Sequence, residues 1–297
     1  MGPGGPVCSR LVAGFWRLRK WDYSTEVLDR FVRSCIDHGV TTMDHADIYG
    51  DYTCEEHFGR VIGLEPSLRQ SMEIVTKCGI MLQNSHTRPG ITHQHYNTGA
   101  DCIISSVDRS LAMLQTDYLD VLLIHRPDTL MNADETAEAF QTLARDGKVK
   151  YFGVSNFTNT QTSLLQSRLP FPLITNQIEC SVFKPEPMYD GILDYCQQHR
   201  INPMAWSPLG GGQLFNEHDD RATALRDVLS SVGREAGGFG PEQVALAWLL
   251  HHPSAIFPVL GTGKTDRIAS ASASVEISLS REQWYRIWSA STGKPVP

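Results

Sequence analysis

Short apolar runs alternate along this chain with longer segments in which apolar and polar residues mix. Residues 24–39 are a segment of the second kind, because apolar residues recur there every three or four positions, as on one face of a helix. Ser24 or Thr25 can cap this helix, and Gly39 can end it. Residues 40–43 form a short apolar run that favours a strand. Both patterns recur along the chain, which predicts a regular succession of strands and helices.

Eight of the short runs have the length of buried strands, and they lie at residues 11–16, 40–43, 73–77, 121–124, 149–154, 173–176, 202–205 and 256–260. Helical patterns lie between them, at residues 54–62, 103–114 and 135–145, around Leu164 and within 210–250. Near the C-terminus, Ser280 and Gln283 form a capping box that begins a final helix. These units predict the α/β class: a (β/α)8 TIM barrel that forms a single domain over residues 1–297, with an additional C-terminal helix.

Three of the predicted strands run directly into an ionisable residue. Asp44 follows the second run and Tyr49 comes five residues later, Lys77 ends the third run, and His125 follows the fourth. In a parallel barrel the carboxyl ends of the strands meet at one rim, where active sites lie, so we expect these four side chains to lie together. We refer to Asp44, Tyr49, Lys77 and His125 as the rim quartet.

The rim quartet has the residue types that acid catalysis on a carbonyl group requires. Tyrosine has an ordinary pKa near 10, and a neighbouring lysine ammonium favours the phenolate and lowers that pKa. We therefore expect Tyr49 to be the general acid, Lys77 and Asp44 to tune it, and His125 to orient the substrate oxygen. Taken singly, Asp44 is as readily a loop cap, Lys77 a solvated lysine and His125 a buried histidine. Their shared position at strand ends favours the joint interpretation.

Composition narrows the class of partner. The 26 Lys and Arg residues against 33 Asp and Glu give a net charge of −7 without a basic block, so general binding to nucleic acid or to anionic membranes is not expected. No apolar run approaches the roughly 18 residues that span a bilayer, and the first residues lack the features of a signal peptide. Seven cysteines without a Cys-x-x-Cys pair favour reduced thiols. We expect a cytoplasmic protein, a monomer or weak homo-oligomer that acts on a small molecule.

Two segments, residues 78–98 and 210–220, are expected to frame a pocket as partly mobile lids because they are long, polar and rich in glycine. The first contains histidines His86, His93 and His95. No carboxylate or cysteine lies close enough in sequence to complete a convincing ligand set with them, so no metal site is predicted. Cys78 is expected to be a packed thiol rather than a reactive one.

Residues 44–50, Asp-His-Ala-Asp-Ile-Tyr-Gly, resemble the Asp-x-Ala-x-x-Tyr-Gly motif of the aldo-keto reductases. Lys77 and His125 match the remaining catalytic positions of that family. Other family-like positions are Cys54, Glu55 and Gly59 and residues 153–157, 176–179 and 206–209. The resemblance covers about residues 11–288, and the tail is similar to a bacterial branch of single-domain NADPH-dependent oxidoreductases. It implies reversible hydride transfer from NADPH to an aldehyde or ketone.

The resemblance also implies where the cofactor binds. Family members bind NADPH extended across the barrel mouth without a Rossmann domain, and this chain lacks the Gly-x-Gly-x-x-Gly motif of that domain. Ser155, Asn156 and Gln177 would hydrogen-bond the nicotinamide carboxamide, and Trp206 would stack on its ring. The remaining cofactor-binding positions are Ser207, Leu209 and Gly210 for the pyrophosphate, Gly261, Thr262, Gly263, Lys264 and Arg267 for the adenosine phosphate, and Trp16. Together with Tyr52 and Trp206, Trp16 would also line an apolar substrate pocket.

The sequence departs from the family pattern at a few positions. Ser270 and Ala271 stand where many relatives carry Glu and Asn against the adenine, which implies looser recognition of the base. His45 replaces a common Thr and is expected to support the site without acting in catalysis. Two rival functions remain open. One is an NADP(H)-binding regulatory or sensor subunit on the same fold with little turnover, and the other is a barrel hydrolase with a metal held by Asp44, His45 and His125.

Overall fold

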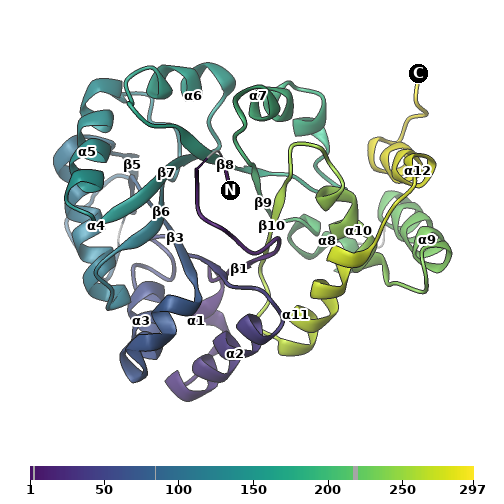
Figure 1. Ribbon diagram of the computed structural model, residues 1–297, viewed down its shortest axis with the longest axis horizontal. Coiled ribbons are helices and arrows are strands. Elements are labelled where there is room, and N and C mark those ends of the chain that lie inside the picture. Colours follow the sequence, from purple (N-terminus) through teal and green to yellow (C-terminus); the bar gives the residue numbers. More distant parts are fainter. Residues whose placement is uncertain (3, 84, 217–219) are drawn as a thin grey trace.

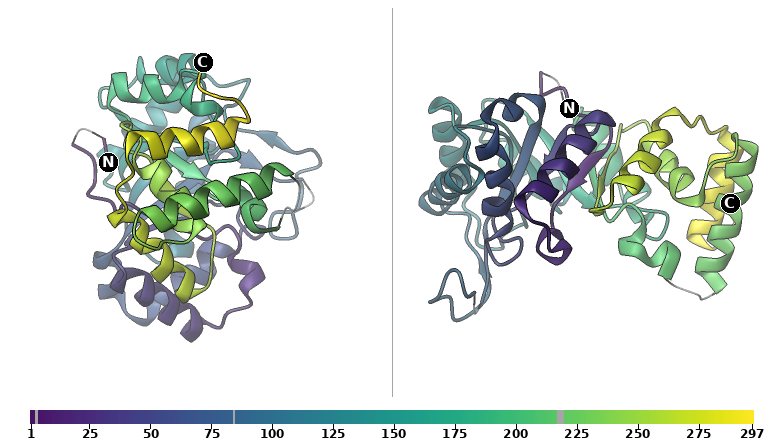
Figure 2. Two further views of the ribbon diagram at one scale, coloured as in Figure 1. Left: turned by 90° about the vertical axis from the view of Figure 1, so that its right-hand side faces the viewer. Right: turned by 90° about the horizontal axis from the view of Figure 1, so that it is seen from below.

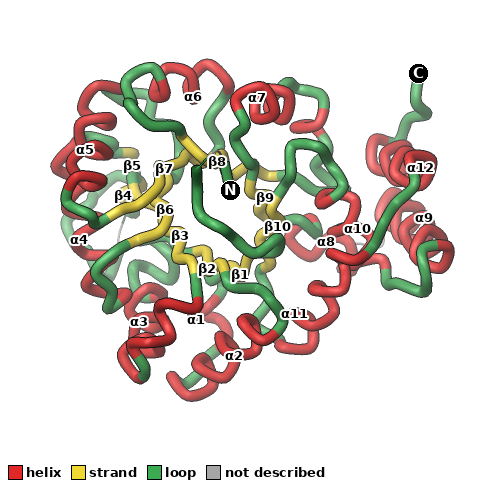
Figure 3. Tube along the Cα trace, viewed as in Figure 1, coloured by secondary structure: helices red, strands yellow, loops and turns green. Residues whose placement is uncertain are grey.

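The computed structural model describes residues 1–2, 4–83, 85–216 and 220–297. Parallel strands form a closed barrel, and helices surround it (Figures 1 and 3). Around the ring the strands follow the order β1-β10-β9-β8-β7-β6-β3-β2, so neighbours in the ring are successive in the chain and β1 pairs with β10. The (β/α)8 TIM barrel predicted from the sequence is confirmed.

The barrel strands lie on the eight apolar runs. They are β1 (Val12–Gly14), β2 (Thr42–Asp44), β3 (Glu73–Cys78), β6 (Leu119–Ile124), β7 (Val149–Ser155), β8 (Leu173–Glu179), β9 (Met204–Trp206) and β10 (Phe257–Leu260). The largest difference from the sequence-based bounds is in β8, which continues past its apolar run to Glu179. Its partner β9 explains this extension, because Gln177 pairs with Met204 and Glu179 pairs with Trp206 across the ladder.

Helices connect the strands on the outside of the barrel. They are α1 (Leu18–Trp21), α2 (Thr25–Asp37), α3 (Cys54–Leu64), α4 (Ala100–Leu114), α5 (Ala133–Arg145), α6 (Asn159–Gln166), α7 (Ile192–His199), α8 (Gln213–Asn216), α9 (Asp220–Glu235), α10 (Pro241–Leu250), α11 (Thr265–Ser272) and α12 (Arg281–Thr292), with 3-10 turns η1 (Pro66–Ser71), η2 (Glu186–Met188), η3 (Gly210–Gly212) and η4 (Ala273–Glu276). The predicted caps of α2 are present: Ser24 accepts a hydrogen bond from the Val27 amide, and Gly39 follows with a φ of 72°.

The interior of the barrel is filled by apolar side chains, most of them branched. They are Val12, Val75, Val121, Leu123, Ile174, Met204, Phe257 and Val259. A second apolar layer lies between the strands and the surrounding helices. The barrel is therefore a packed core and not a pore, so a ligand has to bind at an end of it.

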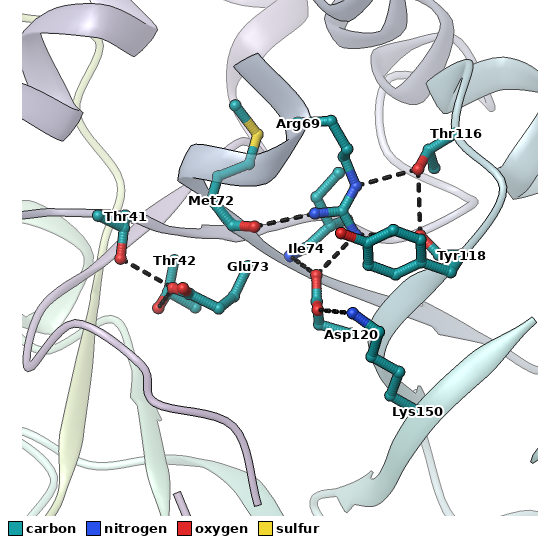
Figure 4. A network of polar contacts seen from close by, with 10 residues as sticks. All are labelled: Thr41, Thr42, Arg69, Met72, Glu73, Ile74, Thr116, Tyr118, Asp120 and Lys150. Atoms are coloured by element: carbon teal, nitrogen blue, oxygen red, sulfur yellow. Dashed lines mark hydrogen bonds and ion pairs between the residues drawn. The ribbon is translucent and has the colours of Figure 1, made fainter. Parts of the chain in front are cut away.

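The amino-terminal end of the barrel carries a polar network that stabilises the fold (Figure 4). Arg69 and Asp120 form a buried ion pair at 2.6 Å, and the same Asp120 oxygen accepts a hydrogen bond from the Ile74 amide. Lys150 binds the other Asp120 oxygen at 3.3 Å. The N-terminal segment crosses this end of the ring (Figure 1), where the Ser9 hydroxyl accepts from the Thr42 amide. These contacts occupy the amino-terminal end of the barrel, so we expect a ligand site at the opposite, carboxyl end.

Segment 78–98 contains structure that the sequence did not predict. Strands β4 (Ile80–Met81) and β5 (His95–Tyr96) pair antiparallel as a small sheet outside the barrel. Residues 217–219 of the second predicted lid lie outside the described part of the chain, and the mobility of both lids stays a prediction. No helix in the described ranges is long and apolar enough to cross a membrane.

Helices α9 and α12 form an outer layer on one side of the molecule, beyond α10 (Figure 2). Glu235 of α9 and Arg286 of α12 form an ion pair at 2.8 Å. The indole N–H groups of Trp248 and Trp284 each donate to the backbone carbonyl of the other residue. The capping box of Ser280 is present as predicted. The C-terminal helix is thereby held against the barrel through α10.

Candidate active site

The four members of the rim quartet meet at the carboxyl end of the barrel. Asp44 ends β2, Lys77 lies one residue before the end of β3, and His125 directly follows β6. Lys77 is fully buried, and its Nζ donates to both Asp44 oxygens at 2.9 and 2.8 Å and to the Tyr49 hydroxyl at 3.1 Å. The Tyr49 and His125 rings pack edge to face with centroids 5.9 Å apart. The predicted convergence of these four side chains is therefore present in the structure.

Strand alternation directs Lys77 into the barrel. Its neighbour Thr76 faces the surrounding helices, where its hydroxyl contacts the Glu55 carboxyl of α3 at 2.5 Å. The other Glu55 oxygen accepts from Ser110 of α4. Because successive strand residues point to opposite faces, a polar outer contact at Thr76 places the Lys77 ammonium inside. Glu55, which the family resemblance marked as family-like, thus connects α3 and α4 to β3 behind the rim quartet.

Tyr49 lies on a tight turn between β2 and α3. Gly50, Asp51 and Tyr52 all have positive φ angles, at 60°, 59° and 64°. The Tyr49 carbonyl accepts from the amides of residues 53 and 54, which connects it to the first turn of α3. Non-glycine residues rarely adopt this conformation and do so where the surroundings impose it. The turn therefore holds the Tyr49 ring at a fixed place beside Lys77.

The electrostatics of the rim quartet keep Tyr49 protonated. Burial raises the pKa of Tyr49, and the Lys77 ammonium opposes that rise without cancelling it. The lowering by Lys77 that the sequence predicts is present, but burial, which the sequence did not reveal, outweighs it. Burial alone would lower the pKa of Lys77, but the Asp44 carboxylate and Tyr49 raise it overall. Burial and the Lys77 and Arg126 charges hold the pKa of His125 well below its usual range. At neutral pH the quartet thus presents a phenol, an ammonium and a neutral imidazole.

The side chains expected at the nicotinamide form a connected group beside the rim quartet. Gln177 of β8 donates to Asp44 Oδ1 at 2.7 Å, so it also belongs to the network around Lys77. Asn156 has a φ of 60° and accepts from the Trp206 indole N–H at 3.0 Å. Its amide nitrogen donates to the Ser155 hydroxyl. Trp206 is only half-buried, which leaves part of its ring available to a ligand.

The residues expected at the phosphates lie after β9 and β10. Ser207 and Gly210 both have positive φ, and the Gly210 amide donates to the Ser207 carbonyl in a tight turn. Gly263 lies against Trp21, where a Cβ atom would come within 2.6 Å of the indole. Lys264 precedes α11, and no side chain caps that helix. The further expected positions are Leu209 and Thr262, both half-buried, and Gly261 and Arg267, both exposed.

Two aromatic residues expected in the substrate pocket differ in position. Trp16 is 61% exposed after β1. Tyr52 is buried, and its hydroxyl donates to the Ile80 carbonyl and accepts from the Leu82 amide. The Arg88 guanidinium covers the Tyr52 ring at 3.7 Å. Tyr52 therefore joins segment 78–98 to the turn after Tyr49 and does not present its ring to an open pocket, because its ring is already covered.

The rival metal site of Asp44, His45 and His125 is contradicted by the geometry. The His45 ring is fully buried between Phe15 and Phe58, with centroid distances of 4.6 and 4.4 Å. Successive strand-end residues point in opposite directions, so His45 faces away from the Asp44 carboxylate. Burial lowers the pKa of His45 to about 3. In the described ranges no three His, Cys, Asp or Glu residues are grouped as metal ligands would be.

Two carboxyl groups to which the sequence analysis gave no role, those of Asp47 and Glu55, are buried close together behind the rim quartet. Asp47 is 2% exposed and neither of its carboxyl oxygens has a hydrogen-bond partner in the described structure. Burial and the nearby Glu55 raise the pKa of Asp47 to about 8. Burial also raises the pKa of Glu55. With a pKa of about 8, the Asp47 carboxyl group is mostly protonated in the folded protein at neutral pH.

We expect Asp47→Asn to reduce the pH dependence of stability. The folded protein keeps a proton on Asp47 that the unfolded chain releases above about pH 4, so the free energy of unfolding falls as the pH rises from about 4 to about 8. Asn at position 47 does not titrate, so the variant should not lose stability in this way. The difference in the free energy of unfolding between variant and wild type should therefore shift in favour of the variant from about pH 5 to about pH 9. Urea unfolding at both pH values measures the free energy of unfolding of variant and wild type. The control is Asp37→Asn, a change at an exposed position. A difference between variant and wild type that is independent of pH would contradict a neutral Asp47.

Both the sequence and the fold of this chain are similar to those of known proteins over nearly the whole chain. The sequence profile of the Aldo/keto reductase family matches residues 10–292. The oxidoreductase YdhF of Escherichia coli is 50% identical over 297 residues, covering 100% of this chain and 98% of that protein. The 6-dehydroglucose reductase of Agrobacterium fabrum is 43% identical over 290 residues, covering 97% and 96%. An aldo/keto reductase from Klebsiella pneumoniae, solved with NADP and acetate, superposes with a TM-score of 0.76 at 26% identity over 98% and 93% of the two chains.

Proposed function

The chain belongs to the aldo-keto reductase family, and we propose that it reduces aldehydes or ketones to alcohols with NADPH, using Tyr49 as the general acid. The observation that supports this most directly is the Lys77 ammonium bonded to both Asp44 oxygens and to the Tyr49 hydroxyl. Such an arrangement stabilises negative charge on an oxygen placed beside the phenol. Carbonyl reduction develops that charge when a hydride reaches the carbonyl carbon.

Each residue of the site has a different role in the proposed reaction. Bound NADPH would supply the hydride. The Tyr49 hydroxyl gives its proton to the carbonyl oxygen as that oxygen becomes negative, and Lys77 stabilises the phenolate that remains. His125 is neutral and orients the carbonyl oxygen toward Tyr49. Because burial keeps Tyr49 protonated, reduction is favoured at neutral pH, and alcohol oxidation needs more alkaline solution.

The residues present fit an extended NADPH molecule. The half-buried Trp206 ring, held by Asn156, offers a surface for the nicotinamide. Gln177 uses its amide nitrogen on Asp44, which leaves its carbonyl oxygen for the carboxamide. At the other end, the amides of Thr265 and Asp266 begin α11 without a hydrogen-bond partner in the described chain, and such helix-start amides suit a phosphate. The solved relative from Klebsiella pneumoniae contains NADP, which supports the same cofactor here.

Cofactor preference should depend on Lys264 and Arg267. NADPH differs from NADH by one phosphate on the adenosine ribose, and both side chains are exposed at the start of α11 without an ion pair in the described chain. Arg binds phosphate through two parallel N–H groups, and Lys adds a compact charge. Replacing both with alanine should raise the Kd for NADPH about tenfold or more and leave the Kd for NADH nearly unchanged.

Tryptophan quenching with both cofactors measures these constants. The matched control replaces Arg145 and Lys148, two surface cations near the end of α5, with alanine. A parallel loss for NADH and NADPH in the Lys264/Arg267 variant would show that these side chains do not distinguish the phosphate.

A panel of carbonyl compounds tests the function, with NADPH oxidation followed by absorbance. The panel should include a sugar aldehyde, because a relative covering nearly the whole chain is a 6-dehydroglucose reductase. A sensor subunit would bind NADPH without oxidising it, whereas the proposed enzyme turns over at least one aldehyde. The complete rim quartet favours the enzyme. Binding without turnover of any aldehyde in the panel would overturn the proposal.

A further inference from the structure

Arg126 is a second ionisable residue at the end of β6, and its surroundings differ from those of other arginines at the rim. It directly follows His125, and its guanidinium carbon lies 5.8 Å from the centroid of the Trp206 ring. Arg17 and Arg19, by contrast, donate to the backbone carbonyls of Gly211 and Gly50. No hydrogen bond or ion pair to the Arg126 guanidinium is present in the described part of the chain.

The contact with Trp206 shows which way Arg126 extends. Trp206 ends β9, and strands β7 and β8 separate β9 from β6 in the ring. A side chain that follows β6 and reaches a ring on β9 must therefore extend over the barrel mouth and not along its outer wall. The Arg126 charge also acts on the His125 imidazole, where it helps to lower the pKa of His125. The Arg126 donors thus lie on the same end of the barrel as the rim quartet.

The carboxylates around the mouth leave the Arg126 charge uncompensated. Asp44 is neutralised by Lys77 at 2.8 Å. Asp128 accepts hydrogen bonds from the Thr98 hydroxyl and the Leu130 amide. Glu179, at the end of β8, forms no ion pair with Arg126 in the described structure. In a protein with a net charge of −7, a half-buried cation without an acidic partner is a suitable anchor for an oxygen-bearing ligand.

We propose that Arg126 binds an oxygen-bearing group of the carbonyl substrate, so that the enzyme prefers carbonyl compounds with a carboxylate or hydroxyl group near the carbonyl over plain alkyl ones. This rests on the proposed reductase function. A guanidinium has five N–H donors and no acceptor, so its ligand must supply oxygen acceptors. Carboxylates bind it most strongly, because both partners are charged. Hydroxyl groups accept hydrogen bonds from the same guanidinium N–H groups, but more weakly, because a hydroxyl group carries no negative charge.

Three aldehydes of similar size test this inference: succinic semialdehyde with a carboxylate, glyceraldehyde with hydroxyls, and butanal with neither. We compare kcat/KM in wild type and in Arg126→Met, which keeps the length of the side chain and its packing on Trp206 but removes the donors. For each aldehyde the ratio of the two values cancels its intrinsic reactivity. We expect a loss of about tenfold or more for succinic semialdehyde, a smaller loss for glyceraldehyde, and the smallest for butanal.

Two further variants complete the design. Arg126→Lys keeps the charge and should recover part of the succinic semialdehyde activity, and Arg30→Met, an exposed change on α2, serves as the control. A larger loss for glyceraldehyde than for succinic semialdehyde would still support an oxygen anchor and would identify hydroxyls as its ligand. Equal losses for all three aldehydes would overturn the inference while the reductase function stands. Absence of turnover with every aldehyde in wild type would overturn both.

Discussion

Tyr49→Phe should lower the rate of carbonyl reduction by about 10²–10⁴-fold, the range that positioned proton transfer contributes. The hydroxyl at 3.1 Å from Lys77 Nζ is the only part of the side chain that the substitution removes. The ring still packs against His125, and none of the residues expected at the cofactor changes. The loss should therefore appear in kcat, whereas the Kd for NADPH should stay within about twofold of wild type.

Single-turnover mixing of the enzyme–NADPH complex with an aldehyde isolates the chemical step, and tryptophan quenching gives the Kd. The matched control is Tyr195→Phe, which removes a hydroxyl that contacts Ser163 on the protein surface. Reduction at the wild-type rate by Tyr49→Phe would refute its assignment as the acid. A rate that falls only because NADPH no longer binds would assign the residue to the cofactor site.

Lys77→Met should affect both stability and activity. Lys77 is completely buried, and its removal leaves the Asp44 carboxylate, which is 2% exposed, without its cation. Breaking a buried ion pair on one side typically costs about 3–5 kcal/mol in the free energy of unfolding. The same change removes the group that stabilises the Tyr49 phenolate, so carbonyl reduction should fall by about 10² or more even in the fraction that remains folded.

A double variant separates these two effects. Asp44→Asn combined with Lys77→Met leaves no charge in the buried pair, and Gln177 can still donate to the side chain at position 44. The double variant should be more stable toward urea than Lys77→Met alone, but its reductase activity should remain low. Recovery of activity together with stability would mean that Lys77 serves only the fold.

The barrel and the rim quartet could be predicted because they depend on local features of the sequence. Each apolar run is long enough to identify a strand, and the order of parallel strands places their carboxyl ends together. Asp44, Lys77 and His125 follow their runs so closely that the direction of each side chain depends only on strand alternation. No knowledge of distant contacts is needed for either prediction.

Contacts between distant strands could not be predicted in the same way. The bond from Gln177 to Asp44 joins β8 to β2, and the contact of Arg126 with Trp206 joins β6 to β9. Both depend on the tilt and closure of the barrel, which leave no local signal in the sequence. The net pKa shift of Tyr49 depends likewise on its burial in the completed fold.

The small sheet in segment 78–98 was missed for a different reason. Strands β4 and β5 have two residues each, which is too short to show an alternating pattern. The backbone pairing of Ile80 with Tyr96 and of Met81 with His95 arises only when the two ends of the segment come together. Tyr52 is buried because Arg88 of the same segment covers its ring, and this contact also could not be predicted from the sequence.

The pairing of β1 with β10 has a consequence for synthesis on the ribosome. Val12 pairs with Val259 and Ala13 with Leu260, so nearly the whole chain must emerge before the ring can close. Translation at about 5–20 residues per second separates the emergence of these two strands by roughly ten to fifty seconds. All four residues of the rim quartet emerge within this interval, well before β10. Until β10 follows, the nascent sheet has an open edge at β1 that can pair with other chains. The emergence of β10 ends this exposure, because β10 pairs with β1 and closes the ring.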